Sequence, residues 1–210
     1  MAGAGTRMRK LAAKNARRKA VVTAKKKAEV SSSSLSERIR SAASCPIARC
    51  VMPAGLFDIG IGHVILARSL PSGLLGCAFF VVDPFCLGIK DAFYAEIAPD
   101  ELRSRMEAQS EFQAFVDTEP SRARKLINDV VAYATGLGLA PAKDFMVVET
   151  LFGAVDAAAC AETFTFGKDG KPFYVTGPLD TPARIRSVSR ILQDRFGTGG
   201  WDFLVQMPPE

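Results

Sequence analysis

The sequence predicts an α+β fold, in which an antiparallel sheet built from two hairpins and a closing strand is packed by about four helices. Runs of β-branched and aliphatic residues are separated by turn signals, which is typical of hairpins. Helical periodicity occurs in separate segments, without the regular strand–helix alternation of a parallel sheet. We expect residues 41–210 to form this single domain, preceded by a basic and disordered arm at residues 1–40.

The first predicted hairpin joins Val64–Leu70 to Leu74–Asp83 through the turn Pro71-Ser72-Gly73. The apolar run Cys77–Val82 does not alternate with polar residues, so we expect a central strand that is covered on both faces. Pro84 ends this strand because proline cannot donate a hydrogen bond to the sheet.

The next segment, Pro84–Tyr94, has mixed character, and Gly88 suggests a bend within it. Apolar spacing favours a helix over Asp100–Val116. A second helix follows, with Thr118 as the predicted N-cap and Gly136 at its end.

The C-terminal half is predicted to continue with mainly helical structure over Phe145–Cys160. The Asp-Gly turn within Lys168–Lys171 predicts a second hairpin, whose strands are the residues on either side of it between 163 and 176. Asp180 or Thr181 would cap a further helix, and Asp202–Met207 would form the closing strand.

Charge divides the chain into two unequal parts. Residues 1–40 hold 12 basic and two acidic residues, net +10, whereas residues 41–210 hold 15 basic and 20 acidic residues, net −5. The N-terminal part has few branched aliphatic residues and no aromatic residue, so it cannot offset the entropy cost of ordering. We expect a disordered arm with an acidic partner, followed by a short helix that Ser34 or Ser36 caps and that reaches Ala43.

The basic side chains of this arm are candidate contacts to nucleic acid or the ribosome, because phosphates are the commonest acidic partners of such segments. The candidates are Arg7, Arg9, Lys10, Lys14, Arg17, Arg18, Lys19, Lys25, Lys26 and Lys27. The clusters Arg17-Arg18-Lys19 and Lys25-Lys26-Lys27 also resemble a nuclear-import signal. The acid-poor composition is also typical of other targeting segments. The sequence leaves these alternatives open.

Composition excludes several classes of protein. His63 is the only histidine, so the chain has no His-rich metal cluster, and any His-based triad would use this residue. The longest apolar stretch, Leu74–Val82, is far shorter than the ~20 residues that a membrane-spanning helix needs. Five cysteines without a secretory signal predict reduced thiols in a cytoplasmic protein, and we expect neither a cofactor nor a membrane partner.

The candidate catalytic residues follow the most apolar strand: Asp83, Cys86, Lys90 and Asp91. Loops beyond strand ends often carry chemistry because the scaffold fixes them. The two carboxylates would suit a divalent cation, with Lys90 steadying an anionic substrate, and Cys86 would be a nucleophile if Lys90 lowered its pKa. The competing interpretation is structural: Cys86 is core, Asp83 caps the following turn, and Lys90 and Asp91 are a solvated pair.

Other motifs have weaker chemical content. Cys45 and Cys50 are too widely spaced and too few for a zinc site, so we predict no metal site. The glycines and lysines of residues 167–171 lack the order of a phosphate-binding loop. Arg186 and Arg190 lie four residues apart on the last predicted helix, with Arg184 nearby, and would extend a nucleic-acid surface if they are not simply solvated.

Two phrases resemble a family of uncharacterised bacterial conserved proteins. They are Phe80–Phe93, with the core Val82-Asp83-Pro84-Phe85-Cys86-Leu87-Gly88-Ile89-Lys90-Asp91, and Phe166–Tyr174, which Gly177-Pro178-Leu179-Asp180 continues. The resemblance covers most of residues 40–207 and implies a bacterial, cytoplasmic protein. It implies no activity, cofactor or catalytic residue.

These observations support two functions of different classes. The first is a non-enzymatic accessory protein whose arm binds nucleic acid or the ribosome and whose body binds a protein partner. The alternative is a small metal- or thiol-dependent enzyme centred on residues 83–91. Whether the chain is an enzyme, and its oligomeric state, stay open at this point.

Overall fold

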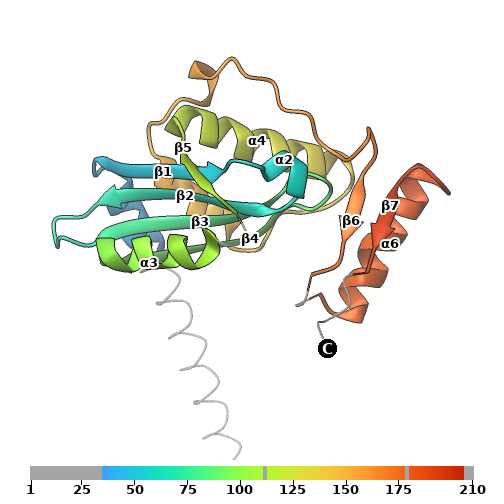
Figure 1. Ribbon diagram of the computed structural model, residues 1–210, viewed down its shortest axis with the longest axis horizontal. Coiled ribbons are helices and arrows are strands. Elements are labelled where there is room, and N and C mark those ends of the chain that lie inside the picture. The colour runs from blue at the N-terminus through green and yellow to red at the C-terminus, as the bar shows by residue number, and fades with distance from the viewer. Residues whose placement is uncertain (1–34, 111–112, 178–179, 206–210) are drawn as a thin grey trace, which may run out of the picture. The chain divides into compact units, whose positions relative to one another are not determined.

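The computed structural model describes residues 35–110, 113–177 and 180–205. The chain divides into two units, residues 1–38 and residues 39–210. Residues 1–34, which include all ten candidate nucleic-acid contacts, lie outside the described residues, and the predicted short helix is present over residues 35–43. The other elements are β1 (Ile47–Pro53), α2 (Leu56–Ile59), β2 (Gly62–Ser69), β3 (Leu75–Asp83), β4 (Gly88–Ile97), α3 (Pro99–Ser110), β5 (Phe115–Asp117), α4 (Pro120–Gly136), α5 (Phe145–Val148), the 3₁₀ helices η1 (Glu149–Phe152) and η2 (Ala157–Ala159), β6 (Phe173–Val175), α6 (Pro182–Phe196) and β7 (Asp202–Leu204) (Figure 1).

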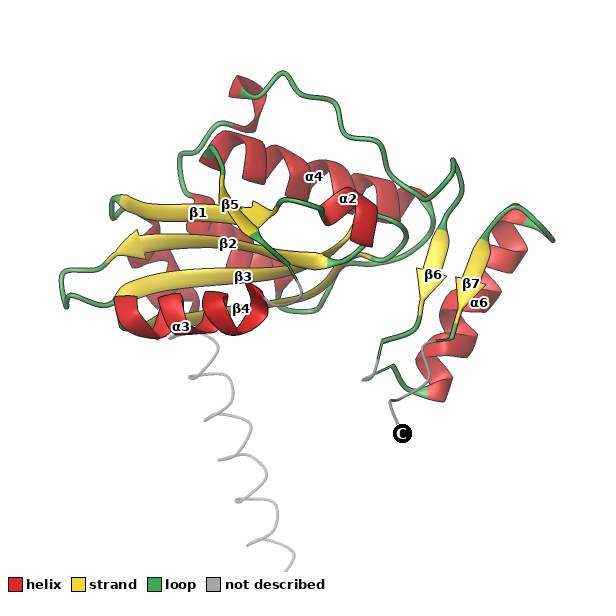
Figure 2. Ribbon diagram, viewed as in Figure 1, coloured by secondary structure: helices red, strands yellow, loops and turns green. Residues whose placement is uncertain are grey.

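The main sheet has five strands in the order β4-β3-β2-β1-β5, and all neighbouring pairs are antiparallel. The first predicted hairpin is confirmed, because β2 and β3 pair from Gly62 and Val82 to Ser69 and Leu75. Gly73 has a φ of +81° in the turn between them, a conformation that glycine adopts without strain. The predicted class, α+β with an antiparallel sheet, is therefore the observed one (Figure 2).

Helices cover both faces of the sheet, with α3 on one side and α4 on the other (Figure 1). Successive residues of β3 point to opposite faces. Phe79 joins a core cluster with Leu102 and Met106 of α3. The ring of Phe80 instead lies 5.8 Å from that of Phe152 in η1, on the other face. The predicted two-sided burial of this strand is thus confirmed.

The helix predicted over Asp100–Val116 is wrong in its last part. The helix α3 ends at Ser110, and Phe115–Asp117 form the edge strand β5, in which Val116 pairs with Met52 of β1. A branched residue next to an aromatic one suits a strand, and the open edge of β1 supplies the backbone partners. This pairing joins residues more than 60 positions apart, so no local periodicity announces it.

The bend predicted at Gly88 is real, and a strand that the sequence did not predict begins there. Gly88 pairs with Asp83 and has a φ of +70°, so β3 and β4 form a second hairpin. A β-carbon at Gly88 would lie 2.7 Å from the β-carbon of Ala134 in α4. Glycine therefore permits both the turn and the close approach of α4.

The second predicted hairpin, at residues 163–176, is wrong although its turn is correct. Lys168 and Lys171 form an isolated antiparallel bridge, and Asp169 and Gly170 have positive φ. The flanking residues do not continue the pairing: β6 instead pairs in parallel with β7, so the predicted closing strand also lies outside the main sheet.

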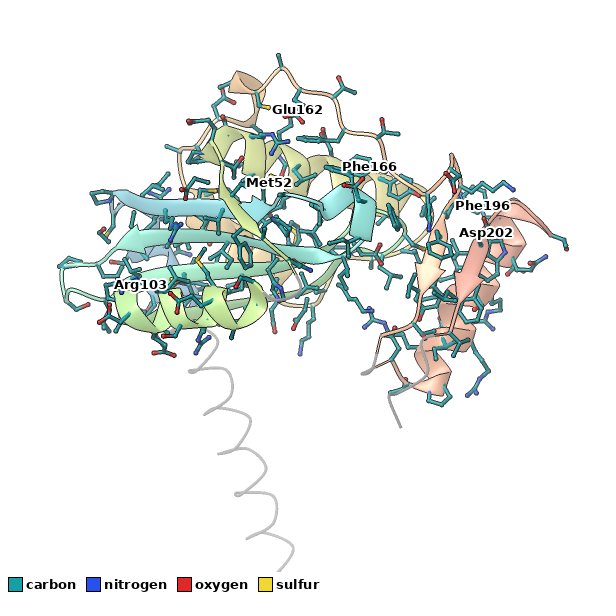
Figure 3. All side chains as sticks on the ribbon, viewed as in Figure 1. Met52, Arg103, Glu162, Phe166, Phe196 and Asp202 are labelled. Carbon is teal, nitrogen blue, oxygen red and sulfur yellow. The ribbon has the colours of Figure 1, made fainter. Side chains whose placement is uncertain are left out.

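Aromatic packing explains why the residues before this turn do not pair. Phe166 lies beside α4 (Figure 3). Its ring is stacked on that of Tyr133 in α4, with centroids 5.2 Å apart. Phe164 is stacked on Phe57 of α2 at 5.9 Å. These contacts hold the segment against α2 and α4 and remove it from β6.

The two long helices of the C-terminal half are confirmed, with small differences at their ends. Thr181 caps α6 by accepting a hydrogen bond from the N–H of Arg184, as predicted. The N-cap of α4 is Glu119 rather than Thr118, and no side chain caps it. The segment Phe145–Cys160 contains only short helices, α5, η1 and η2. None of the helices in the described ranges is long and apolar enough to cross a bilayer.

A buried arginine fastens two segments to the sheet through three backbone carbonyls. Arg68 of β2 is only 6% exposed. Its guanidinium donates to the backbone carbonyls of Cys45 at 2.5 Å, Leu151 at 2.8 Å and Phe152 at 2.7 Å. The planar group with several fixed donors satisfies carbonyls that water does not reach.

Replacing this arginine should destabilise the protein strongly. Arg68→Met keeps the stem but leaves three carbonyls without a donor, and we expect a loss of about 3 kcal/mol in the free energy of unfolding. Arg49→Met is the matched control, since the Arg49 side chain on β1 is 44% exposed and pairs with Asp117. That change should cost at most about 1 kcal/mol. Urea unfolding measures both, and equal losses would contradict the role assigned to Arg68.

Candidate functional site

The candidate residues 83–91 form the turn between β3 and β4 and the start of β4. Asp83 accepts hydrogen bonds at Oδ1 from the N–H groups of Phe85 at 3.0 Å and Cys86 at 2.9 Å. An aspartate that bonds to the backbone just ahead of it stabilises a compact turn. The structural role proposed for Asp83, as a cap of this turn, is therefore present in the structure.

The backbone of this turn also holds distant segments. The carbonyl of Pro84 accepts from the N–H of Gly167 at 2.9 Å. The carbonyl of Phe85 accepts from the N–H of Phe173 and from the hydroxyl of Tyr133, both at 3.1 Å. The turn thus fixes where the C-terminal segment lies relative to the sheet.

A cavity of about 440 Å³ lies beside the turn. The sheet side contributes Val81, Asp83, Phe85, Lys90 and Asp91, and the connection from α2 to β2 contributes Ile59, Gly60 and Ile61. The C-terminal segment closes it with Phe173, Val175, Gly177, Asp180 and Arg184. The volume lies within the range of small-molecule sites.

Asp180 is the centre of the polar wall. Its Oδ2 lies 3.4 Å from Nζ of Lys90 and accepts from the N–H of Gly177 at 2.8 Å and from the hydroxyl of Tyr174 at 3.2 Å. Its Oδ1 lies 3.3 Å from Nε of Arg184. Burial by itself would raise the pKa of Asp180, but the Gly177 N–H and the two cations lower it below its usual value. Asp180 is therefore a paired carboxylate.

Asp83 has the opposite balance. Burial raises its pKa to about 6, although the backbone N–H groups of the turn and the charge of Lys90 oppose that shift. A carboxyl group with such a pKa exchanges a proton near neutral pH, which suits general acid–base chemistry.

Asp91 lies on the exposed side of the cavity wall. Its Oδ1 accepts a hydrogen bond from the N–H of Ala92, and it has no cationic partner within 4 Å among the described residues. Val81 pairs with both Asp91 and His63 across the strands on either side of it. Burial lowers the pKa of His63, an effect that the charge of Asp91 partly opposes. His63 does not line the cavity.

The side chain of Cys86 lies outside the cavity that the other three candidates line. Its side chain is 0% exposed and packs in a core cluster with Leu87, Ala134 and Tyr174. Burial raises the pKa of the thiol, the reverse of what a nucleophilic cysteine requires. The structure therefore brings Asp83, Lys90 and Asp91 to one cavity and places Cys86 in the core.

The sequence interpretation missed the far wall of the cavity. The sequence pattern indicates Asp180 only as a helix cap and Arg184 only as part of a basic helix. Their sequence signal is a carboxylate directly before a helix with an arginine four residues later, which predicts a local ion pair. Nothing local indicates Lys90, which is 90 positions away from Asp180.

The part of the chain that the structure describes shows no group of three or more His, Cys, Asp or Glu side chains that would hold a metal ion. All five cysteines lie in this part and are free thiols.

Comparison of the chain with protein-family models, with curated protein sequences and with solved structures gave no match.

The raised pKa of Asp83 predicts a pH-dependent cost to folding. The native pKa, about 6, exceeds the reference value of 3.8, so the native state binds the extra proton between these values and stability falls as pH rises from 4 to 6. The buried charge should cost on the order of 3 kcal/mol at pH 7. Asp83→Asn retains an oxygen acceptor for the turn and removes that charge.

Urea unfolding of wild type and Asp83→Asn at pH 4, 5, 6 and 7 measures this effect. As the pH rises from 4 to 7, the free energy of unfolding of Asp83→Asn should increase relative to that of wild type. Asp100→Asn is the control, because the Asp100 side chain is 87% exposed on α3. Parallel pH profiles for wild type and Asp83→Asn would show that Asp83 has an ordinary pKa.

Proposed function

We propose that the protein is a non-enzymatic accessory protein that binds nucleic acid or the ribosome through its basic residues 1–40, while residues 41–210 bind a protein partner. The observation that carries this proposal is the division of charge, net +10 in the first segment and net −5 in the second. A segment of that charge attracts phosphates, and the acidic body does not compete for them. The resemblance to bacterial conserved proteins supports a role in the bacterial cytoplasm.

The described helix α6 adds a second basic surface to this proposal. It carries four arginines and one aspartate, and all four arginines are exposed: Arg184, Arg186, Arg190 and Arg195. A groove between α6 and β7 is lined by Arg186, Arg190, two serines and Phe203. Guanidinium groups beside a partly exposed aromatic ring suit a single-stranded nucleic acid, since bases stack on such rings.

The edge of β7 supports the protein-partner part of the proposal. Leu204 is 52% exposed and Val205 55% exposed, directly after Phe203 at 40%. Three consecutive exposed apolar residues at the end of an edge strand are typical of an interaction site.

Salt dependence tests the nucleic-acid proposal on the full chain. Affinity for single-stranded RNA should fall with salt by a log–log slope of roughly −0.7 for each phosphate contact. Neutralising Lys25, Lys26 and Lys27 to Gln should make the slope less steep by about 2. Arg186→Gln combined with Arg190→Gln should make the slope less steep by about 1. Fluorescence anisotropy at several salt concentrations measures each slope.

The control for the α6 variant removes two positive charges from another helix, by Arg103→Gln with Arg105→Gln on α3. Both arginines are paired with acidic residues of their own helix, Asp100 and Glu101. This variant should bind as wild type does. An unchanged slope after the three lysine changes would remove the arm from the proposal.

A second candidate function is a small enzyme centred on residues 83–91. The specific observation in its favour is the convergence of Asp83, Lys90 and Asp91 on one cavity, with the pKa of Asp83 raised to about 6. Asp83 would act as the general acid or base, and Asp91 would orient the substrate. Cys86 has no part in this candidate because it lies in the core.

Complementation tests the enzyme candidate. In a strain with a phenotype caused by deletion of the gene, Asp83→Asn and Asp91→Asn should fail to restore function if they fold normally. Asp100→Asn should restore it fully. Full restoration by all three variants would remove the catalytic role from the cavity.

A further inference from the structure

The cavity has more negative than positive groups in its walls. Asp83, Asp91 and Asp180 face two cations, Lys90 and Arg184. Both cations contact Asp180, at 3.4 Å and 3.3 Å, and this carboxylate is only 3% exposed. Asp180 balances one of these two charges, and together with Asp83 and Asp91 the five side chains sum to a net charge of −1. An anionic ligand in the cavity would therefore meet a net negative charge.

The two remaining carboxylates are not paired in this way. Neither Asp83 nor Asp91 has a cation within 4 Å among the residues the structure describes. Asp83 is held by backbone N–H groups, and Asp91 by one. Two carboxylates beside an apolar cavity attract a cation. The attraction between opposite charges is stronger where water is excluded, because the dielectric constant is lower there.

The rest of the cavity is apolar and aromatic. Ile59, Ile61 and Val175 line it together with the rings of Phe85 and Phe173, whose centroids are 6.2 Å apart. Nζ of Lys168 already lies 4.8 Å from the centroid of Phe173, so this ring attracts one cation within the protein. The face of an aromatic ring attracts an organic cation. Aromatic rings also pack against the apolar part of such a ligand.

We propose that this cavity binds a small organic ammonium compound, a protonated amine carried on an apolar or aromatic body. The ammonium group lies between Asp83 and Asp91, and the body packs against Phe85 and Phe173. The inference is independent of nucleic-acid binding. It uses the same cavity as the enzyme candidate and names its ligand class, but binding does not require turnover.

A metal ion fits the same carboxylates less well. The described residues supply no third His, Cys, Asp or Glu ligand at this place. A bare cation would also leave the apolar walls in contact with water, whereas an amine with a hydrophobic body covers them.

Two probes with the same body and opposite charge test the inference on the full-length protein. Phenethylammonium carries the proposed head group, and 3-phenylpropanoate places a carboxylate on a phenylalkyl body of similar size. Saturation-transfer NMR and isothermal titration at pH 7.5 measure both. The amine should bind at least tenfold more tightly than the carboxylate.

Asp91→Asn should weaken amine binding about tenfold, because it removes the exposed carboxylate without disturbing the core. Val175→Trp should block the cavity and abolish binding. The matched controls are Asp100→Asn on α3 and Val116→Trp on β5, since Val116 is 43% exposed and outside the cavity. Both controls should bind as wild type does, and circular dichroism checks that every variant is folded.

Equal binding of the two probes, tighter binding of the carboxylate, or binding that Asp91→Asn leaves unchanged would overturn the inference. Because no turnover is measured, such a result would not decide the enzyme candidate, which depends on complementation. The salt dependence of RNA binding is likewise a separate measurement, so failure of one proposal is distinguishable from failure of the other.

Discussion

The carboxylate of Asp180 is the interaction on which the candidate site depends. It joins Lys90 of β4, Tyr174 of β6 and Arg184 of α6, so that one side chain connects the main sheet to the C-terminal segment. Lys90 is largely withdrawn from water, with 15% of its side chain exposed, and a buried charge without a partner is costly. The ion pair both satisfies Lys90 and places the far wall of the cavity. Removing Asp180 would leave two carboxylates and two cations in the cavity walls, so the net negative charge would be lost together with the position of the far wall.

The two proposed functions use surfaces that differ in position and in charge. In the cavity, the cations are used internally and carboxylates face the space that a ligand would enter. On α6, exposed arginines face solvent beside Phe203. The helix therefore takes part in both surfaces: Arg184 in its first turn belongs to the cavity wall, whereas Arg186 and Arg190 line the groove. Residues two to six positions apart on one helix thus have different electrostatic roles.

Local patterns in the sequence predicted the elements whose partners are near in the chain. The β2–β3 hairpin follows from apolar runs on either side of a Pro-Ser-Gly turn, and α6 follows from its cap and apolar spacing. The failures involve distant partners. Phe115–Asp117 became a strand because β1 had an open edge, and Phe173–Val175 paired with β7 rather than with residues just before them. At the site, the sequence predicted Asp83, Lys90 and Asp91, which are close in the chain, but not their association with Asp180.

Docking of the C-terminal segment depends on the backbone carbonyls of Pro84 and Phe85. They accept hydrogen bonds from Gly167, Phe173 and Tyr133, which arrive from positions 48 to 88 residues further along the chain. These acceptors are in place only after β3 and β4 have closed their turn, since Asp83 sets the turn's geometry. Contacts of such separation close long loops, which costs more chain entropy than closing a hairpin turn. The position of the C-terminal segment is therefore set by backbone groups of a turn that lies far earlier in the chain.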